Sequence, residues 1–179
     1  PSIFFFNTNP SATFKGSSGK DVELSYSLMG IGLHWGRLRI ETTNRGNGSI
    51  KDEGKSADYF YFSDGTNIHR VDSTSASIWR IMYGNEATGG WREKIWMTRK
   101  KGEVFSWVYG IGYESVTLIL LTQDDGERKI KMKNPVADFG LQWNWPHVYL
   151  VTKYGFALTE EVTNFSYNEG FSVGIGFIW

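Results

Sequence analysis

Bulky apolar residues alternate with small residues through the last nine positions of the chain, residues 171–179. A β-strand repeats its side-chain direction every second residue, so this segment has two distinct faces. One face carries Phe171, Val173, Ile175, Phe177 and Trp179, and the other carries Ser172, Gly174, Gly176 and Ile178. A soluble barrel would bury the bulky face and leave an uncharged, glycine-rich surface in water. A membrane barrel turns the bulky face toward lipid and the glycines toward a narrow lumen, and the pattern favours this second arrangement.

The same alternation recurs along most of the chain and predicts eight strands in an antiparallel meander. We expect strands over residues 21–43, 58–71, 77–84, 91–100, 104–122, 128–144, 147–158 and 171–179. The first of them contains Gly30, Gly32 and Gly36, which interrupt its phase as a bulge or bend would. The sequence therefore predicts an all-β fold, an antiparallel up-and-down transmembrane β-barrel of about eight strands.

The first twenty residues have a different composition from the rest. Residues 1–20 are rich in turn-forming residues, and we interpret them as an N-terminal periplasmic segment that precedes the first strand. The apolar residues 3–6 within this segment can form an extra strand, a plug or a contact with the barrel rim. Residues 21–179 are expected to form a single β-barrel domain, because a chain of 179 residues is too short for two comfortable domains.

The connections between the expected strands divide into two sets. An even number of strands puts both termini on one side, which is the periplasmic side in bacterial barrels. The short connections near residues 71–76, 100–102 and 144–147 then fall on that side. The outer loops lie near residues 44–57, 84–90, 123–126 and 159–170. Three of these four are longer than the opposite turns, as is usual in membrane barrels.

Composition removes several classes of function. The 19 basic and 19 acidic residues cancel, so nucleic acid is not expected as a partner. Cysteine is absent, which excludes disulfides, thiolate metal sites and cysteine nucleophiles. No apolar run approaches 18 residues, so no transmembrane helix is expected. No metal ion, no cofactor and no catalytic residues are expected either.

The tripeptide Gly-Ile-Gly occurs three times, at residues 30–32, 110–112 and 174–176. A nucleotide-binding loop needs its glycines between a strand and a helix, whereas a strand continues through each of these segments. The interior of an eight-stranded barrel is only just wide enough for side chains. We therefore interpret these glycines as positions that make room for larger neighbours.

Six polar residues are predicted to face the lumen. They are Glu23, Arg80, Glu114, Asp138, Gln142 and Lys153. Charges at such positions can serve an active site, but buried charges must be paired, and in a small barrel they more often form an ion-paired network that fills the interior. The structural interpretation implies a closed lumen without a wide pore.

A second candidate site is a row of lysines after the turn near residue 124. Lys129, Lys131 and Lys133 share one face of a strand and can meet lipopolysaccharide phosphates or an acidic partner above the bilayer. A solvated strand face is the alternative. On the neighbouring strand, the apolar residues Val116, Leu118 and Leu120 fit a polar lumen poorly. Either they cap the barrel inside its outer rim, or a bulge near Glu114 reverses the phase of the strand.

The alternating C-terminal strand, which closes on the aromatic residue Trp179, resembles the terminal strand of bacterial outer-membrane β-barrels. The resemblance is clearest over residues 104–179 and is to the small, eight-stranded class that includes adhesin and membrane-integrity proteins. It implies a closed barrel in the bacterial outer membrane, in contact with outer-membrane lipid and lipopolysaccharide. It also implies that the outer loops, chiefly residues 44–57 and 159–170, bind host molecules, neighbouring cells or surface glycolipid.

A soluble antiparallel barrel that binds an apolar small molecule, as lipocalins and avidins do, is the main alternative. It would explain the apolar faces formed by Leu118 and Leu120 and by Ile130 and Met132. It explains an outward belt of large aromatic residues less well, because soluble surfaces rarely expose so much contiguous apolar area. That belt is expected to include Trp107, Tyr109, Trp143 and Tyr154.

A second alternative is an outer-membrane enzyme that modifies lipid A. Deacylases of this kind carry a His-x-Ser arrangement on one strand. In this chain the residues two positions after His34, His69 and His147 are glycine, valine and tyrosine, so none of the three fits. The palmitoyl-transferring barrels begin with an amphipathic helix, which residues 1–20 do not resemble. We therefore expect a protein that is not an enzyme.

Overall fold

The computed structural model describes residues 1–16, 19–63, 65–84, 105–124, 126–145, 147–158, 165–168 and 170–179. These residues form β-strands joined by turns, and none of them is helical. Within this part of the chain, no helix is long and apolar enough to cross a membrane.

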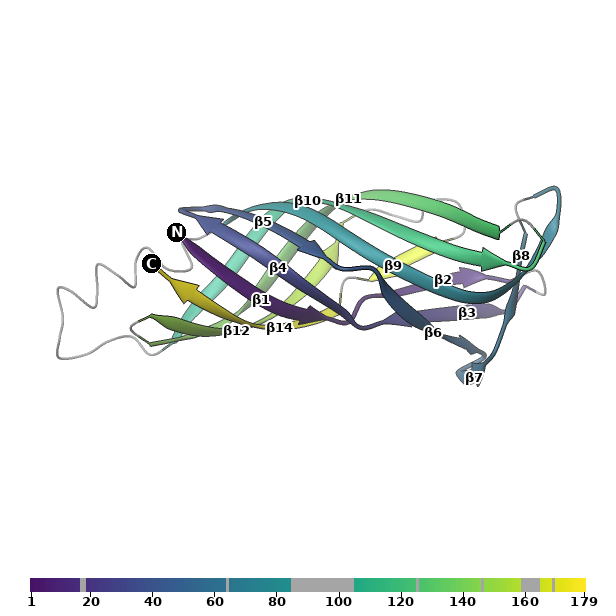
Figure 1. Ribbon diagram of the computed structural model, residues 1–179, viewed down its shortest axis with the longest axis horizontal. Coiled ribbons are helices and arrows are strands. Elements are labelled where there is room, and N and C mark those ends of the chain that lie inside the picture. The colour runs from purple at the N-terminus through teal and green to yellow at the C-terminus, as the bar shows by residue number, and fades with distance from the viewer. Residues whose placement is uncertain are drawn as a thin grey trace.

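Eight strands close an antiparallel barrel (Figure 1). They are β1 (Ser2–Thr8), β4 (Leu28–Trp35), β5 (Leu38–Thr43), β9 (Ile68–Gly84), β10 (Phe105–Thr122), β11 (Gly126–Asn144), β12 (Val148–Ala157) and β14 (Gly170–Ile178). Neighbours in this list are hydrogen-bonded to one another, and β14 returns to pair with β1, which closes the ring. The fold is therefore an up-and-down barrel, as the alternation predicts.

Six shorter strands extend the barrel at the end away from the two termini (Figure 1). They are β2 (Ser11–Lys15), β3 (Asp21–Tyr26), β6 (Gly46–Asp52), β7 (Lys55–Ala57), β8 (Phe60–Ser63) and β13 (Phe165–Asn168). Five of them pair in the order β13-β2-β3-β6-β7, and β8 pairs with β9. Together with residues 68–77 of β9, 115–122 of β10 and 126–134 of β11, these strands are called the extension. The remaining part of the barrel is called the body.

The two parts have opposite polarity, and β10 shows the change within four residues. In the body, the outward Tyr113 is exposed and apolar while the inward Glu114 is buried and charged. In the extension, the outward Ser115 is polar and the inward Val116 is fully buried. The pairing of β10 with β9 and β11 runs without a shift from Glu114 to Leu120. These apolar residues therefore cap the barrel at the end opposite the termini, as the first alternative predicts, and no bulge reverses the phase at Glu114.

The N-terminal prediction needs correction. Residues 1–20 do not precede the barrel, because β1 lies in its wall between β14 and β4. Phe4 and Phe6 point inward and Phe5 points outward, so the apolar patch is a strand, as one of the three alternatives proposed. Turn-forming residues 9–10 do not end the wall but separate β1 from β2.

The expected strand over residues 21–43 is also wrong. It is two antiparallel segments, β3–β4 and β5, which reverse direction at Gly36, a glycine with φ of 60°. Residues 44–57, expected to be an outer loop, instead contain β6 and β7. Their glycine, serine and asparagine residues resemble a loop in composition, yet they form a strand. Asn47 and Ser49 face outward, whereas Gly46 and Gly48 face inward with Ile50 and leave room for Leu28 and Tyr26.

The expected strand over residues 91–100 and the loop at 85–90 lie outside the described residues. Among the described residues the barrel has eight strands, because residues 1–43 supply three where one is expected, while the strands expected at 58–71 and 77–84 merge largely into β9. Gly84, at the end of β9, donates a hydrogen bond to the carbonyl of Arg37 in the turn between β4 and β5. The connection after β9 therefore starts at the end that carries the termini, which corrects its expected position on the outer side.

Candidate functional site

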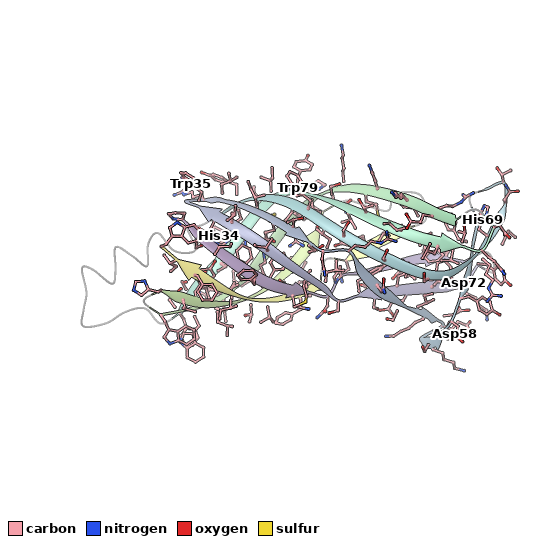
Figure 2. All side chains as sticks on the ribbon, in the orientation of Figure 1. His34, Trp35, Asp58, His69, Asp72 and Trp79 are labelled. Atoms are coloured by element: carbon pink, nitrogen blue, oxygen red, sulfur yellow. The ribbon has the colours of Figure 1, made fainter. Side chains whose placement is uncertain are left out.

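The outer surface of the body is an apolar belt. On β10 it presents Phe105, Trp107, Tyr109, Ile111 and Tyr113, and on β14 it presents Phe171, Val173, Ile175 and Phe177. Large aromatic residues lie at both of its edges, with Trp35, 79% exposed, near the termini and Trp79 at the junction with the extension (Figure 2). Soluble proteins rarely expose a contiguous apolar surface of this extent.

The lumen near the termini is filled by aromatic rings. Phe4 lies 5.3 Å from Phe6 and 4.6 Å from His34 between ring centroids, and Tyr149 stacks on His34 at 6.3 Å. Glycines make this packing possible, because a Cβ on Gly32 would lie 1.9 Å from the Phe4 ring. The steric interpretation of the Gly-Ile-Gly segments therefore agrees with the geometry.

A layer of six charged side chains crosses the middle of the barrel. Three are cations and three are carboxylates, and all are buried: Arg39, Arg80, Lys153, Glu41, Glu114 and Asp138. Asp138 accepts two hydrogen bonds from Arg39, at 2.5 and 2.6 Å, and lies 3.2 Å from the Lys153 Nζ. Glu41 contacts Lys153 directly and lies 3.2 Å from an Arg80 nitrogen. The layer is neutral as a whole, which is what a buried charge cluster requires.

Five of the six residues predicted to face the lumen do so. Arg80, Glu114, Asp138 and Lys153 belong to the charged layer, and Gln142 donates to Asn144 at 2.6 Å nearer the termini. Arg39 and Glu41 were missed, although both alternate with Leu38 and Ile40 in the sequence. The prediction of a single strand over residues 21–43 did not separate residues 37–43 as a strand of their own, so the inward face of that strand was not recognised.

Glu23 is the exception and requires correction. It lies half-buried on the outer face of β3, where it accepts a hydrogen bond from Ser25 at 3.2 Å. In the strand register it is opposite Lys51 of β6. Its neighbours Leu24 and Tyr26 are the buried residues. The prediction applied the polarity of a membrane wall to a strand that belongs to the extension, where the apolar face is inside.

The inside of the extension is a continuous hydrophobic core. It joins the two facing sheets through Phe14, Val22, Leu24, Ile50, Phe60, Val71, Val116, Leu118, Leu120 and Met132. A single polar pair crosses it among the hydrogen bonds described, from the Tyr26 hydroxyl to Thr74 at 2.6 Å. Burial raises the pKa of Tyr26 to about 12. This core closes the barrel above the charged layer.

The three predicted lysines lie on the outer face of the extension. Lys129, Lys131 and Lys133 are exposed and paired with Ile119, Thr117 and Ser115 of β10. Arg45 reaches across the same sheet, donating to Ser75 at 2.8 Å and pairing with Glu127 at 3.0 Å. The opposite sheet mixes both signs, with Lys51 facing Glu23 and Lys15 facing Asp21. The cationic face is therefore confined to the side formed by β9, β10 and β11.

A groove opens at the tip of the extension, and sequence reasoning did not find it. Its volume is about 560 Å³, and its lining comes from the β2–β3 connection and from the segment between β6 and β8. Lys20 at its rim pairs with Glu53 at 2.9 Å, and this contact raises the pKa of Lys20. The expected binding segment 44–57 contributes Asp52, Ser56 and Ala57 to the lining. Of the other expected segment, residues 159–164 and 169 lie outside the described part of the chain.

The three histidines lie apart. His34 is in the aromatic layer of the lumen, His69 is buried in the extension at the opposite end, and His147 is exposed in the turn before β12 (Figure 2).

No family model matches the chain, and no curated protein matches it. Among solved structures, the chain is similar to Ail, the attachment invasion locus protein of Yersinia pestis, solved with the heparin analogue sucrose octasulfate. That similarity has 9% identity and a TM-score of 0.47, and it covers 98% of this chain and 97% of the other. The translocator domain of the autotransporter NalP from Neisseria meningitidis matches with 11% identity and a TM-score of 0.37, covering 99% and 88%. Scores below 0.5 are too low to support an assignment, so the barrel fold rests on its own strand pairing.

Proposed function

We propose that this protein is an outer-membrane barrel whose body spans the bilayer and whose extension carries a ligand-binding surface outside the cell. The observation that carries the proposal is the exchange of polarity along single strands, from polar-in and apolar-out in the body to the reverse in the extension. Lipid favours the first arrangement and water the second. No soluble environment explains both on one strand.

The dimensions of the belt agree with a membrane span. Residues 105–113 of β10 extend about 30 Å at roughly 3.3 Å per residue, and a tilt of about 40° reduces this to about 23 Å. The apolar band of outer-membrane barrels is about 25 Å tall. Aromatic residues such as Trp35 and Trp79 lie at the two edges of the belt, where such barrels carry their girdles.

The cationic face lies at the right height to meet lipid phosphates. Lys133 is paired with Ser115, two residues beyond the last belt residue of β10, and Lys131 and Lys129 continue away from the bilayer. We propose that these three lysines, at this height above the belt, bind phosphate groups of lipopolysaccharide in the outer leaflet. Glu127, on the same strand, already pairs with Arg45, so this carboxylate does not neutralise the three lysines.

We further propose that the lumen does not conduct and that the protein binds rather than catalyses. The charged layer and the two hydrophobic clusters follow one another along the barrel interior. Against an enzyme, His34 contacts aromatic rings rather than a nucleophile, and His69 lies at the other end of the molecule. Replacement of all three histidines by alanine is expected to leave lipid A composition unchanged, and a lost lipid A modification would contradict the binding role.

Fractionation of cells that express the chain with a secretory leader tests the location. We expect it in the outer membrane, soluble only after detergent extraction, and migrating as a compact species on a gel until it is boiled. Recovery as a detergent-free soluble monomer would contradict the proposal and favour the soluble barrel with an apolar ligand.

A further inference from the structure

Two exposed tyrosines at the tip of the extension have no structural task in the core. Tyr59 and Tyr61 are 42% and 46% exposed, while Phe60 between them points inward and packs 4.8 Å from Phe14. Lipid does not account for this exposure, because the adjacent Asp58 lies at the end of the molecule opposite Trp35 (Figure 2). Exposed aromatic residues away from the membrane mark binding surfaces.

The two rings are held in place before any ligand arrives. The Arg70 guanidinium lies 4.1 Å from the centroid of the Tyr59 ring, and its Nε donates to Asp72 at 2.7 Å. Tyr59 and Tyr61 meet edge to face, with centroids 5.7 Å apart and an interplanar angle of 80°. A surface whose side chains are already ordered loses little conformational entropy on binding.

The charges around the groove select against anions. Asp52 and Asp58 line it together with Lys20, and Lys20 is already paired with Glu53 at 2.9 Å. Among the lining residues, two carboxylates therefore stand against one cation that is already paired, which disfavours sulfate or phosphate groups. Carboxylates accept hydrogen bonds only, so they suit a ligand that is rich in hydroxyl donors.

We propose that this groove binds an uncharged sugar residue of a cell-surface glycan. The C–H face of a pyranose packs against the Tyr61 and Tyr59 rings, and its hydroxyls donate to Asp52 and Asp58. A volume of about 560 Å³ lies within the range of small-molecule sites. The inference depends on the proposed function only in that the extension faces the outside of the cell, and it names the ligand class for that surface.

The test is an array of neutral, sialylated and sulfated glycans probed with the full-length protein folded in detergent, followed by titration of the best neutral ligand. We expect neutral glycans to bind, and Tyr61→Ala to weaken binding by about tenfold, since the stacking surface is lost. Tyr61→Phe keeps that surface and is expected to stay within about threefold. Asp58→Asn, which adds donors where the sugar needs an acceptor, is expected to weaken binding about fivefold.

Tyr109→Ala is the matched control, because Tyr109 is similarly exposed at 54% but lies in the belt. Heat-modifiable migration shows whether each variant is folded. Binding of sulfated glycans alone, binding of a peptide partner alone, or full affinity in Tyr61→Ala would overturn the inference. The array uses purified protein, so its result does not depend on where the protein is found in the cell. If the protein fractionates with the outer membrane but binds no neutral glycan, the sugar site is wrong and the proposed function stands. If the fractionation experiment instead recovers the chain as a soluble protein, the proposed function is wrong.

Discussion

Glycine and large side chains are paired across the lumen wall, and this pairing sets how much can fit inside eight strands. Gly32 faces Phe4, Gly30 faces Phe6 and Gly176 faces Tyr149, with ideal Cβ positions 1.9, 2.3 and 2.0 Å from the respective rings. Each aromatic ring thus occupies the space that a side chain on its partner strand would need. The packing depends on particular pairs and not on glycine content as such.

Gly32→Ala is expected to lower the free energy of unfolding by about 1–3 kcal/mol, because the Phe4 ring has to move out of its position. Combination with Phe4→Leu should recover part of the loss, since the smaller side chain frees space. The measurement is urea unfolding in detergent or lipid, and Gly16→Ala is the control because its Cβ would come no closer than 3.4 Å to any neighbour. Equal stability of the Gly32 variant and the control would contradict this account of the lumen.

A second residue-scale prediction compares two glutamates. Glu41 touches three cations inside the barrel, and Glu23 lies on the outer face of β3. Glu41→Gln leaves three buried cations with two carboxylates and is expected to destabilise the barrel by about 3–5 kcal/mol. Glu23→Gln is expected to change stability by less than about 0.5 kcal/mol. The same unfolding assay measures both losses of stability. If Glu23→Gln destabilises the barrel as strongly as is expected for Glu41→Gln, Glu23 faces the lumen.

At the scale of elements, the sequence predicts long strands well when the two-residue period continues without a break. β10, β11, β12 and β14 lie close to their expected ranges for this reason, although the polarity of the two faces reverses along β10 and β11. The first half of the chain was misassigned because its strands are broken by Asn9-Pro10, Ser27 and Asn44-Arg45, where body and extension meet. Each break coincides with the exchange of polarity, so a single period read through the break gives a wrong face, as it did for Glu23.

The lysine face of β11 yields an element-scale prediction. Replacement of Lys129, Lys131 and Lys133 by glutamine is expected to reduce the lipopolysaccharide that copurifies with the protein, since three phosphate-binding charges are removed. The control replaces Lys15, Lys51 and Lys55 of the opposite sheet by glutamine, with the same change in net charge. We expect the loss to shrink as salt concentration rises. Equal losses in the two variants would show that binding depends on net charge and not on this face.

For the whole molecule, eight strands, antiparallel order, both termini at one end and a filled interior were accessible from the sequence. The groove at the tip was not, because its lining comes from Lys20 before β3, Asp52 of β6 and Tyr61 of β8, which only the pairing of the extension brings together. Neither was the extent of the extension, since its polar surface resembles loop composition. The molecule is one long wall whose polarity reverses between body and extension, as the proposed membrane boundary requires.

That boundary can be measured directly, because the chain has no cysteine and single cysteines can be introduced without background. Spin labels at positions 109, 111, 113, 115, 117 and 121 of β10 would follow the outward face of one strand in lipid vesicles. We expect labels at Tyr109, Ile111 and Tyr113 to collide with oxygen dissolved in lipid, and those from Ser115 onward to collide with a water-soluble nickel reagent. The change should fall between positions 113 and 115. Uniform access to the water-soluble reagent along all six positions would contradict the membrane assignment of the body.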